Sequence, residues 1–217
     1  MEEIAIIGAS GHAKVIFDII KKQRKYKVIA FLEVDLGLIQ KEYFGIRILD
    51  EHLFPFRQFS NVVLALGDNY KRFVVFQKLI KSYPHLSYPC LVHPSAQIGE
   101  NVLIGHGSVV MANSVINADS FVGDFCIVNT SASIDHDCTL QNFSSIAPGA
   151  VLGGSVVLGE FSAVGIGASI SHGVEIGYDT VVGAGAVIVT DIPNEIVCYG
   201  VPAREIRKRS RGEKYLN

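Results

Sequence analysis

An aliphatic residue occupies every sixth position of this chain from Ile98 to Ile188, without interruption. If about a third of all positions were aliphatic, an unbroken run of this length would arise by chance with a probability of about 10⁻⁸. The register consists of Ile98, Ile104, Val110, Ile116, Val122, Val128, Ile134, Leu140, Ile146, Leu152, Leu158, Val164, Ile170, Ile176, Val182 and Ile188. A small or modest side chain follows four residues after nearly every one of them. Short strands repeating at this period predict a parallel β-helix.

The residues that follow the aliphatic positions vary along the repeat. Glycine stands there at 99, 105, 123, 153, 159, 165, 177 and 183. It is expected where a chain turns at positive φ or packs closely against a neighbouring turn. Between Val128 and Ile146 the glycines disappear, and the corresponding residues are Asn129, Asp135, Gln141 and Ala147. This stretch keeps the register but changes its corners, which makes it a candidate site for chemistry.

The first ninety residues follow a different pattern, in which apolar runs alternate with helical spacing. Strands are expected at 3–8, 27–33, 45–49 and 61–66, and helices at 13–22 and 70–82. Such alternation predicts a small parallel sheet. We therefore predict a Rossmann-like α/β domain over 1–90, a β-helix over 93–192 and a C-terminal segment over 193–217.

Three of the expected strands end in residues suited to a ligand. Gly8 and Gly11 lie where the first strand gives way to a helix, whose N-terminus favours a phosphate, although this spacing also suits an ordinary tight turn. Glu33 and Asp35 close the second strand, where an acidic residue commonly meets a ribose hydroxyl. Gly67 closes the fourth. Parallel strand ends share one edge, so we expect a ligand there.

The altered corners contain a histidine between carboxylates, Asp135-His136-Asp137. A carboxylate hydrogen-bonded to one ring nitrogen makes the other nitrogen a better general base near neutral pH. His136 is therefore the catalytic candidate, against the alternative that it is an ordinary surface histidine at a β-helix corner.

A metal site is a second alternative, because His106, His136 and His172 each follow a sextet aliphatic by two residues. If three sextets form one coil, His136 and His172 share a face but lie two coils apart, at roughly 10 Å. Ligands of one zinc ion must each approach within about 2 Å of it. We therefore predict no metal within one chain, although histidines from neighbouring subunits could meet.

Composition narrows the classes of partner. A formal net charge of −2 and the absence of a basic, aromatic-rich stripe argue against nucleic-acid binding. The longest apolar runs fall short of the ~20 residues that a membrane span needs, and no signal segment is recognisable, so we expect a cytoplasmic protein. The four cysteines lack metal-ligand spacing and are expected to be reduced core residues. The basic residues from Arg204 to Lys214 suit either a solvated or a phosphate-contacting tail.

Taken together, several motifs resemble one family of enzymes. They are Gly8-Ala9-Ser10-Gly11-His12, Ala65-Leu66-Gly67-Asp68-Asn69, His93-Pro94-Ser95-Ala96, Asn129-Thr130, Asp135-His136-Asp137-Cys138, Ala147-Pro148-Gly149-Ala150 and Gly200-Val201-Pro202-Ala203. The chain resembles the bacterial sugar-nucleotide acetyltransferases of the left-handed β-helix, hexapeptide-repeat superfamily. It is most similar to those that N-acetylate 4-amino sugars, with sialic acid O-acetyltransferases as more distant relatives.

The resemblance implies a homotrimer, with acetyl-CoA as co-substrate in the groove between adjacent β-helices and an active site shared by two subunits. It implies that His136 is the general base and that Asp137 raises its basicity. The substrate residues implied are Ser10, Gly11 and His12 at the phosphates, Glu33, Asp35 and Gly67 around the nucleoside, and Asn129 at the sugar. Those implied for acetyl-CoA are Ser145, Ile166, Ala184, Gly200 and Pro202. The chain departs from many members at Ser145, where they carry a second histidine, and at Glu33-Val34-Asp35, where they carry paired aspartates.

The expected reaction is acetyl transfer from acetyl-CoA to the 4-amino group of a nucleotide-linked 4-amino-4,6-dideoxy sugar. One alternative keeps the enzyme class but acetylates a hydroxyl of sialic acid or a related sugar. Another, from a different class, is a non-catalytic trimeric scaffold that binds nucleotide sugars. A γ-class carbonic anhydrase would need closely spaced metal histidines, which the sequence lacks.

Overall fold

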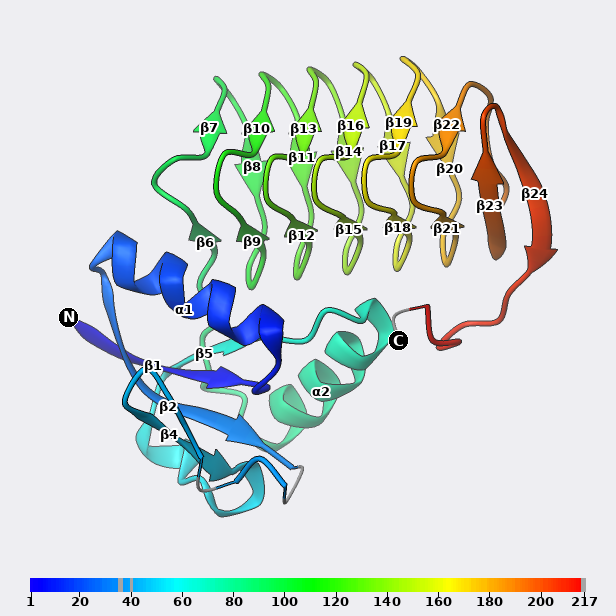
Figure 1. The fold of residues 1–217 in the computed structure, drawn as a ribbon. Helices are drawn as coiled ribbons and strands as arrows, with labels where there is room; N and C mark the ends of the chain where they lie inside the picture. The colour runs from blue at the N-terminus through cyan, green and yellow to red at the C-terminus, as the bar shows by residue number, and fades with distance from the viewer. Residues whose placement is uncertain (35–36, 40, 216–217) are drawn as a thin grey trace.

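The computed structural model describes residues 1–34, 37–39 and 41–215, and it comprises an α/β unit and a long coil of short strands (Figure 1). The α/β unit contains β1 (Glu2–Ile7), α1 (Gly11–Gln23), β2 (Tyr26–Glu33), β3 (Glu42–Tyr43), β4 (Ile46–Asp50), η1 (Glu51–Leu53), η2 (Phe56–Gln58), β5 (Asn61–Leu64) and α2 (Asn69–Ser82). The sheet order is β3-β4-β2-β1-β5, and only β3 is antiparallel to its neighbour. The expected strands and helices are all present, whereas β3 and the two 3₁₀ turns were not predicted.

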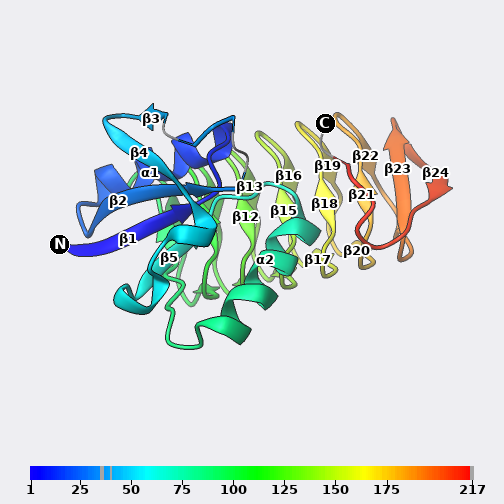
Figure 2. The same ribbon diagram turned by 90° about the horizontal axis from the view of Figure 1, so that it is seen from below.

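The two helices cover opposite faces of this sheet. From α1, Ile16 and Ile20 pack with alternate β1 residues and with the first strands of the β-helix, whereas Val15, expected on the same apolar face, is exposed. From α2, Leu79 packs on the other face, and the side chain of Asp68 caps this helix by accepting the N–H of Lys71. Figure 2 shows both helices beside the strands of one β-helix face. The α/β unit is thus packed directly against the β-helix through a shared hydrophobic core, and is not joined to it by the chain connection alone.

The β-helix has three faces. Face 1 contains β6 (Leu91–Val92), β9 (Val109–Val110), β12 (Ile127–Val128), β15 (Ser145–Ile146), β18 (Ala163–Val164) and β21 (Val181–Val182), continued by β23 (Ile196–Gly200) and β24 (Ala203–Lys208). Face 2 contains β7 (Gln97–Ile98), β10 (Val115–Ile116), β13 (Ser133–Ile134), β16 (Val151–Leu152), β19 (Ser169–Ile170) and β22 (Val187–Ile188). Face 3 contains β8 (Leu103–Ile104), β11 (Phe121–Val122), β14 (Thr139–Leu140), β17 (Val157–Leu158) and β20 (Glu175–Ile176).

Each coil takes 18 residues, so that Ile116 pairs with Ile134 in parallel register. From Val110 to Ile188 the aliphatic register forms one continuous core along the β-helix axis, and Ile104 packs against its end, whereas Ile98 is exposed. Polar residues at the small interior positions are satisfied: Ser108 donates to the carbonyl of Gly123 at 2.7 Å and accepts the N–H of Cys126 at 2.8 Å. The predicted fold class, an α/β domain followed by a left-handed parallel β-helix, is confirmed.

The corners show why glycine follows the aliphatic residues. The positive-φ residues of the corners stand two positions later, for example Asn101, Phe125 and Asp137, so the corner glycines are not there for φ. A Cβ at Gly99 would lie 2.6 Å from the backbone nitrogen of Ala118 in the next coil, a distance that atoms in contact do not reach. Of the two reasons expected from the sequence, close packing is therefore the correct one.

Three phenylalanines attach the α/β unit to the corner between faces 3 and 1. Phe125, Phe143 and Phe161 stand one coil apart, with ring centroids 5.0 Å and 5.5 Å from one to the next. Phe73 and Phe76 of α2 pack against this stack. We call these three residues the phenylalanine ladder. It turns one corner of the β-helix into a buried interface.

Arg72 of α2 ties the same corner to the α/β unit. Its guanidinium is 1% exposed and donates to the carbonyls of Phe125 at 2.8 Å, Phe143 at 3.2 Å and Leu66 at 2.7 Å. It also donates to the side-chain oxygen of Asn69 at 2.8 Å. Burial lowers the pKa of Arg72, and these bonds compensate for the lost hydration of its charge, which makes no ion pair with a carboxylate of the described residues.

Candidate active site

His136 lies at the corner between faces 2 and 3, after β13. Asp137 adopts the left-handed conformation, with φ 59°, which aspartate tolerates better than most residues. Its Oδ2 lies 2.6 Å from Nδ1 of His136. Asp135 accepts the backbone N–H of His136 at 2.9 Å and the side-chain amide of Asn117 at 2.9 Å. The corner thus holds the imidazole by one nitrogen.

The electrostatics of this corner suit a base. The hydrogen bond to Asp137 raises the pKa of His136 above its ordinary value, and the nearby charge of Asp135 raises it further. With Nδ1–H donated to Asp137, Nε2 carries the lone pair. The side chain of His136 is 51% exposed, so this nitrogen is accessible.

The rings of His136 and His172 lie closer together than the sequence suggested. The rings of His136 and His172 have centroids 6.2 Å apart, so the expectation of roughly 10 Å was wrong. Gly154 occupies the coil between them, and a Cβ there would lie 2.6 Å from Cε1 of His136, so the ring leans into space that glycine leaves open. In the described ranges, no group of three or more His, Cys, Asp or Glu residues is arranged to hold a metal ion.

The ends of β1, β2 and β5 meet at one edge of the sheet, as expected; we call it the strand-end rim. Gly8 donates to the carbonyl of Leu32 at 2.8 Å, and Ala9 donates to Oε2 of Glu33 at 3.1 Å. Glu33 therefore braces the turn before α1 as well as standing at the expected ribose position. Asp35, the other acidic residue expected there, lies outside the described residues.

His12 follows Ser10 and Gly11 in the first turn of α1. Burial, followed by the nearby charge of Arg72, lowers the pKa of His12 to about 4. Its Nε2 is buried and has no hydrogen-bond partner among the described residues. The imidazole is therefore neutral near pH 7 and offers one unused polar atom.

Two adjoining cavities lie between the α/β unit and the β-helix. One, of about 790 Å³, is lined by Ser10, His12, Ala65, Leu66, Gly67, Asp68, Lys71, Val181, Val197, Arg207, Arg209, Glu213, Lys214 and Tyr215. The other, of about 440 Å³, is lined by His12, Gly67, Ile127, Asn129, Ser145, Ile146, Ala147, Ala163, Val164, Gly165, Ile166, Val181, Val182, Gly183, Ala184 and Tyr215. We call them the rim cavity and the corner cavity. They share His12, Gly67, Val181 and Tyr215, so they adjoin at these residues.

The structure brings together most of the residues predicted for the two substrates. Asn129, Ser145, Ile166 and Ala184 line the corner cavity together with His12. Asn129 follows β12 at the corner between faces 1 and 2, and its side-chain oxygen accepts the N–H of Thr130 at 2.8 Å.

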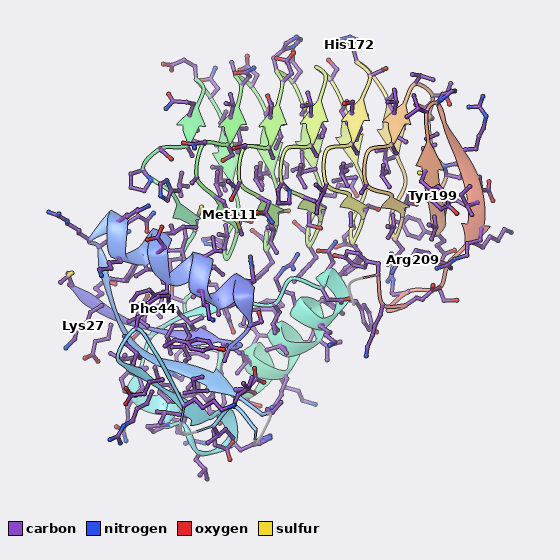
Figure 3. The ribbon with its side chains drawn as sticks, viewed as in Figure 1. Lys27, Phe44, Met111, His172, Tyr199 and Arg209 are labelled. Carbon is purple, nitrogen blue, oxygen red and sulfur yellow. The ribbon has the colours of Figure 1, made fainter. Side chains whose placement is uncertain are left out.

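Other predicted residues lie elsewhere in the chain. Neither His136 nor Asp137 lines either cavity, because their corner is a different one from that of Asn129. His172, on the corner of His136, points away from the α/β unit in Figure 3. Gly200 and Pro202 also line neither cavity and lie at the turn between β23 and β24.

Among the cavity residues, Lys71 and Tyr215 were missed from the sequence, and Lys214 belongs to the tail whose role was left open. Lys71 lies in the first turn of α2, while Lys214 and Tyr215 come from the segment after β24 that returns to the α/β unit (Figure 1). The basic composition of that segment was the available signal, since it left open a phosphate-contacting tail.

Two family models match parts of the chain. The PglD N-terminal domain matches residues 3–79, and the bacterial transferase hexapeptide model, six repeats, matches residues 95–130. No curated protein matches.

Solved structures match nearly the whole chain. An Asn-for-His variant of perosamine N-acetyltransferase from Caulobacter crescentus, in complex with CoA and GDP-perosamine, is 35% identical with a TM-score of 0.89, and the match covers 96% of this chain and 98% of that one. The acetyltransferase domain of PglB from Neisseria gonorrhoeae, in complex with acetyl coenzyme A, is 36% identical with a TM-score of 0.86, covering 94% and 99%. WeeI from Acinetobacter baumannii shares the fold at 24% identity, with a TM-score of 0.85 over 95% and 100%.

The chain belongs to the sugar N-acetyltransferases of the hexapeptide-repeat transferases. The resemblance inferred from its motifs is therefore confirmed. In the part of the chain that the structure describes, neither helix has the length and apolar character needed to cross a membrane.

Proposed function

We propose that this chain acetylates the 4-amino group of a nucleotide-linked 4-amino-4,6-dideoxy sugar with acetyl-CoA, using His136 as the general base. The enzyme class follows from family membership: it is an acetyl-CoA-dependent sugar-nucleotide N-acetyltransferase. The observation that carries the role of His136 is its 2.6 Å contact with Asp137, which leaves Nε2 exposed with a raised pKa. The perosamine relative, whose structure holds CoA and an amino sugar nucleotide, favours an amine over a hydroxyl acceptor.

The reaction places one proton on His136. The amine attacks the thioester carbonyl, the C–N bond forms, and Nε2 of His136 takes the proton that the nitrogen must lose. The tetrahedral oxyanion then collapses, the C–S bond breaks, and CoA leaves as its thiolate, which His136⁺ can protonate. The products are the acetamido sugar nucleotide and CoA, and no covalent enzyme intermediate is needed.

The separation of His136 from the cavities supports a homotrimer. Sugar-site residue Asn129 and base candidate His136 lie at different corners of one β-helix, so one chain does not present both to one cavity. In a three-fold assembly, the corner of His136 in one subunit can face the corner cavity of the next. We propose that each site is built in this way, with acetyl-CoA running past Ser145, Ile166 and Ala184 and its adenine end near Gly200 and Pro202. We also propose that the enzyme acts in the cytoplasm.

The reaction is tested by acetyl transfer. The purified protein is offered acetyl-CoA with 4-amino-4,6-dideoxy sugars linked to UDP, GDP or dTDP, and with sialic acid as a hydroxyl acceptor, while free thiol release is measured. We expect thiol release with at least one amino sugar nucleotide and an acetamide product by mass spectrometry. If only sialic acid supported turnover, the acceptor would be a hydroxyl rather than an amine. Binding of a nucleotide sugar without any turnover would favour the non-catalytic scaffold.

The shared site is tested by complementation. His136→Ala and His12→Ala are each expected to be inactive as homo-oligomers, because they lie on the two parts of the site. Co-expressed in equal amounts, they should regain about a quarter of wild-type activity, because each site then draws both intact residues with a one-in-two chance apiece. No recovery in hybrids shown to contain both chains would mean that both residues serve one site within one chain.

A further inference from the structure

The rim cavity is unusually rich in cations. Besides the strand-end rim it is lined by Lys71, Arg207, Arg209 and Lys214, against the two carboxylates of Asp68 and Glu213. The rim residues come from one end of the chain and three of the four cations from the other, so the tertiary fold alone assembles this cavity (Figures 1 and 3).

Two of the four cationic side chains already bind protein groups, and the other two form no ion pair within the part of the chain that the structure describes. Arg207 pairs with Glu213 at 2.6 Å. Arg209 is buried and donates to the carbonyl of Asp179 at 3.1 Å. Lys71 and Lys214 make no ion pair with any carboxylate of the described residues. Two ammonium groups therefore remain for an anion.

The same cavity receives the N-terminus of α1 and an unused imidazole nitrogen. α1, of 13 residues, begins after Ser10, whose side chain makes no capping hydrogen bond, whereas the carboxylate of Asp68 already caps α2. Free N–H groups and the helix dipole favour an anion at the N-terminal end of α1. The buried Nε2 of His12, which has no partner among the described residues, belongs to a side chain that lines this cavity. With its imidazole neutral, it can donate to a phosphate oxygen.

Tyr215 anchors the segment that carries Lys214. Its hydroxyl lies 3.3 Å from the N–H of Asn69, 3.4 Å from the carbonyl of Gly67 and 3.5 Å from Oγ of Ser145. Burial raises the pKa of this phenol, so it stays protonated. The guanidinium of Arg209 lies over the ring at 5.6 Å from its centroid. Tyr215 therefore joins the strand-end rim to face 1 where the two cavities adjoin.

We propose that the segment 209–215 forms the second wall of the nucleotide-sugar site, in which Lys71 and Lys214 bind the diphosphate and Tyr215 is the positioning residue that holds this wall in place. The proposal rests on the proposed function, which supplies a nucleoside diphosphate sugar as substrate. CoA carries a diphosphate too. The nucleotide is favoured because residues that follow β1 and β5 at the strand-end rim, such as Ser10 and Gly67, line this cavity, whereas Ile166 and Ala184, proposed for acetyl-CoA, line only the corner cavity.

The first test measures binding rather than turnover. Dissociation constants of UDP, GDP, dTDP and CoA are measured by calorimetry for the full chain, its Lys71→Gln/Lys214→Gln variant and a matched Lys81→Gln/Lys208→Gln variant. Lys81 lies in the last turn of α2 and Lys208 at the end of β24, and neither lines the rim cavity. Each lost charge-assisted contact should weaken the preferred nucleotide about tenfold, so about 100-fold for the pair. The Lys81→Gln/Lys208→Gln control should bind the nucleotide as tightly as the wild type does, and neither variant should change the affinity for CoA.

Each result of this test decides the proposal. Unchanged nucleotide affinity in Lys71→Gln/Lys214→Gln would overturn it, as would the absence of nucleotide binding by the wild type. Weakened CoA binding with unchanged nucleotide binding would assign the rim cavity to CoA instead. Weakened nucleotide binding in a protein that acetylates no amino sugar would contradict the proposed function while leaving the diphosphate site in place.

The second test isolates the hydroxyl of Tyr215. Tyr215→Phe keeps the ring under Arg209 and removes only the atom that contacts Asn69, Gly67 and Ser145. We expect the KM for the nucleotide sugar to rise several-fold, and by more than the KM for acetyl-CoA, with an unchanged melting temperature. Equal changes in both KM values, or a change in melting temperature alone, would show a merely structural role and overturn the assignment of Tyr215.

Discussion

Two corners of the same β-helix carry large side chains, which are buried at one corner and exposed to solvent at the other. At the corner between faces 3 and 1, Phe125, Phe143 and Phe161 are buried beneath α2. At the corner between faces 2 and 3, His136 and Asp137 are exposed, and His172 of the same corner points away from the α/β unit in Figure 3. The backbone is the same at both, since Phe143 and Asp137 stand at equivalent positions with φ 57° and 59°.

The difference shows that different corners of one repeat can serve different purposes: the buried corner stabilises the fold, and the exposed corner carries the candidate catalytic residues. A buried corner gains stability from aromatic packing, about 25 cal/mol for each Å² of apolar surface removed from water. An exposed corner gains nothing of that kind, so a charged triplet such as Asp135-His136-Asp137 can stand there at a small desolvation cost that its hydrogen bonds outweigh. Substitutions at the exposed corner should therefore change turnover, and substitutions at the buried corner should change stability.

The largest effect is expected from the exposed corner. His136→Ala should lower turnover by about 10²–10⁴-fold, the usual contribution of a general base, because it removes the Nε2 that takes the proton from the attacking amine. Steady-state kinetics with the preferred amino sugar nucleotide measures it. His172→Ala is the matched control on the same corner, and it should retain near wild-type turnover. Full activity of His136→Ala would remove His136 from the mechanism.

The phenylalanine ladder should respond in stability instead. Phe143→Ala should lower the free energy of unfolding by about 3–5 kcal/mol, because it empties the middle of a buried aromatic stack. Urea denaturation of the purified protein measures the loss. Phe121→Ala, at a site on face 3 that is 43% exposed, is the control and should cost much less. Equal losses at the two positions would mean that the ladder is not a special interface.

The pH profile distinguishes a tuned base from a surface histidine. Protonation inactivates a base, so activity should fall as the pH drops through the raised pKa of His136. Asp137→Asn removes the main cause of that rise, and the acid limb of kcat/KM should move to lower pH. The rate at neutral pH should fall roughly 10-fold to 100-fold with the lost charge-assisted hydrogen bond.

Asp119→Asn provides the matched control for this profile. Asp119 stands one coil earlier at the same corner, in the same left-handed conformation, and its carboxylate accepts from the side-chain amide of Asn101 at 2.9 Å. Its substitution should leave the acid limb in place. A shift toward higher pH in Asp137→Asn would contradict the assigned direction.

The smallest effect is expected at Gly154. Gly154→Ala brings a methyl group to 2.6 Å from Cε1 and 2.7 Å from Nε2 of His136. The exposed ring can turn aside, so the melting temperature should hardly change while turnover falls several-fold. Combined with His136→Ala, it should produce no further loss of turnover, because the two changes act through one side chain. Additive losses would show that Gly154 acts elsewhere.

The repeat could be predicted from the sequence, and so could part of the candidate site. An aliphatic residue every six positions needs no tertiary information, because each short strand buries the same register position. His136 was identifiable because Asp135 and Asp137 adjoin it in the chain, and Gly8, Gly11 and Gly67 because strand ends of a parallel sheet share one edge.

Other features depended on contacts that no local pattern records. The 18-residue spacing of Phe125, Phe143 and Phe161 is visible in the sequence, but nothing local indicates that α2 covers them. The distance between His136 and His172 was overestimated because strand spacing describes the backbone, whereas Gly154 lets a side chain lean across the gap. Tyr215 was missed because Asn69 and Gly67, which its hydroxyl contacts, lie more than a hundred residues away in the chain.

The sequence by itself determined the β-helix, the α/β domain and the charged corner, because each depends on residues near one another in the chain or on a strict period. Only the tertiary structure decided which corner is buried, which is free, and which distant residues meet in the rim cavity. The physical reason is that a repeat presents equivalent corners in every coil. Packing of one helix against one of them makes those corners different.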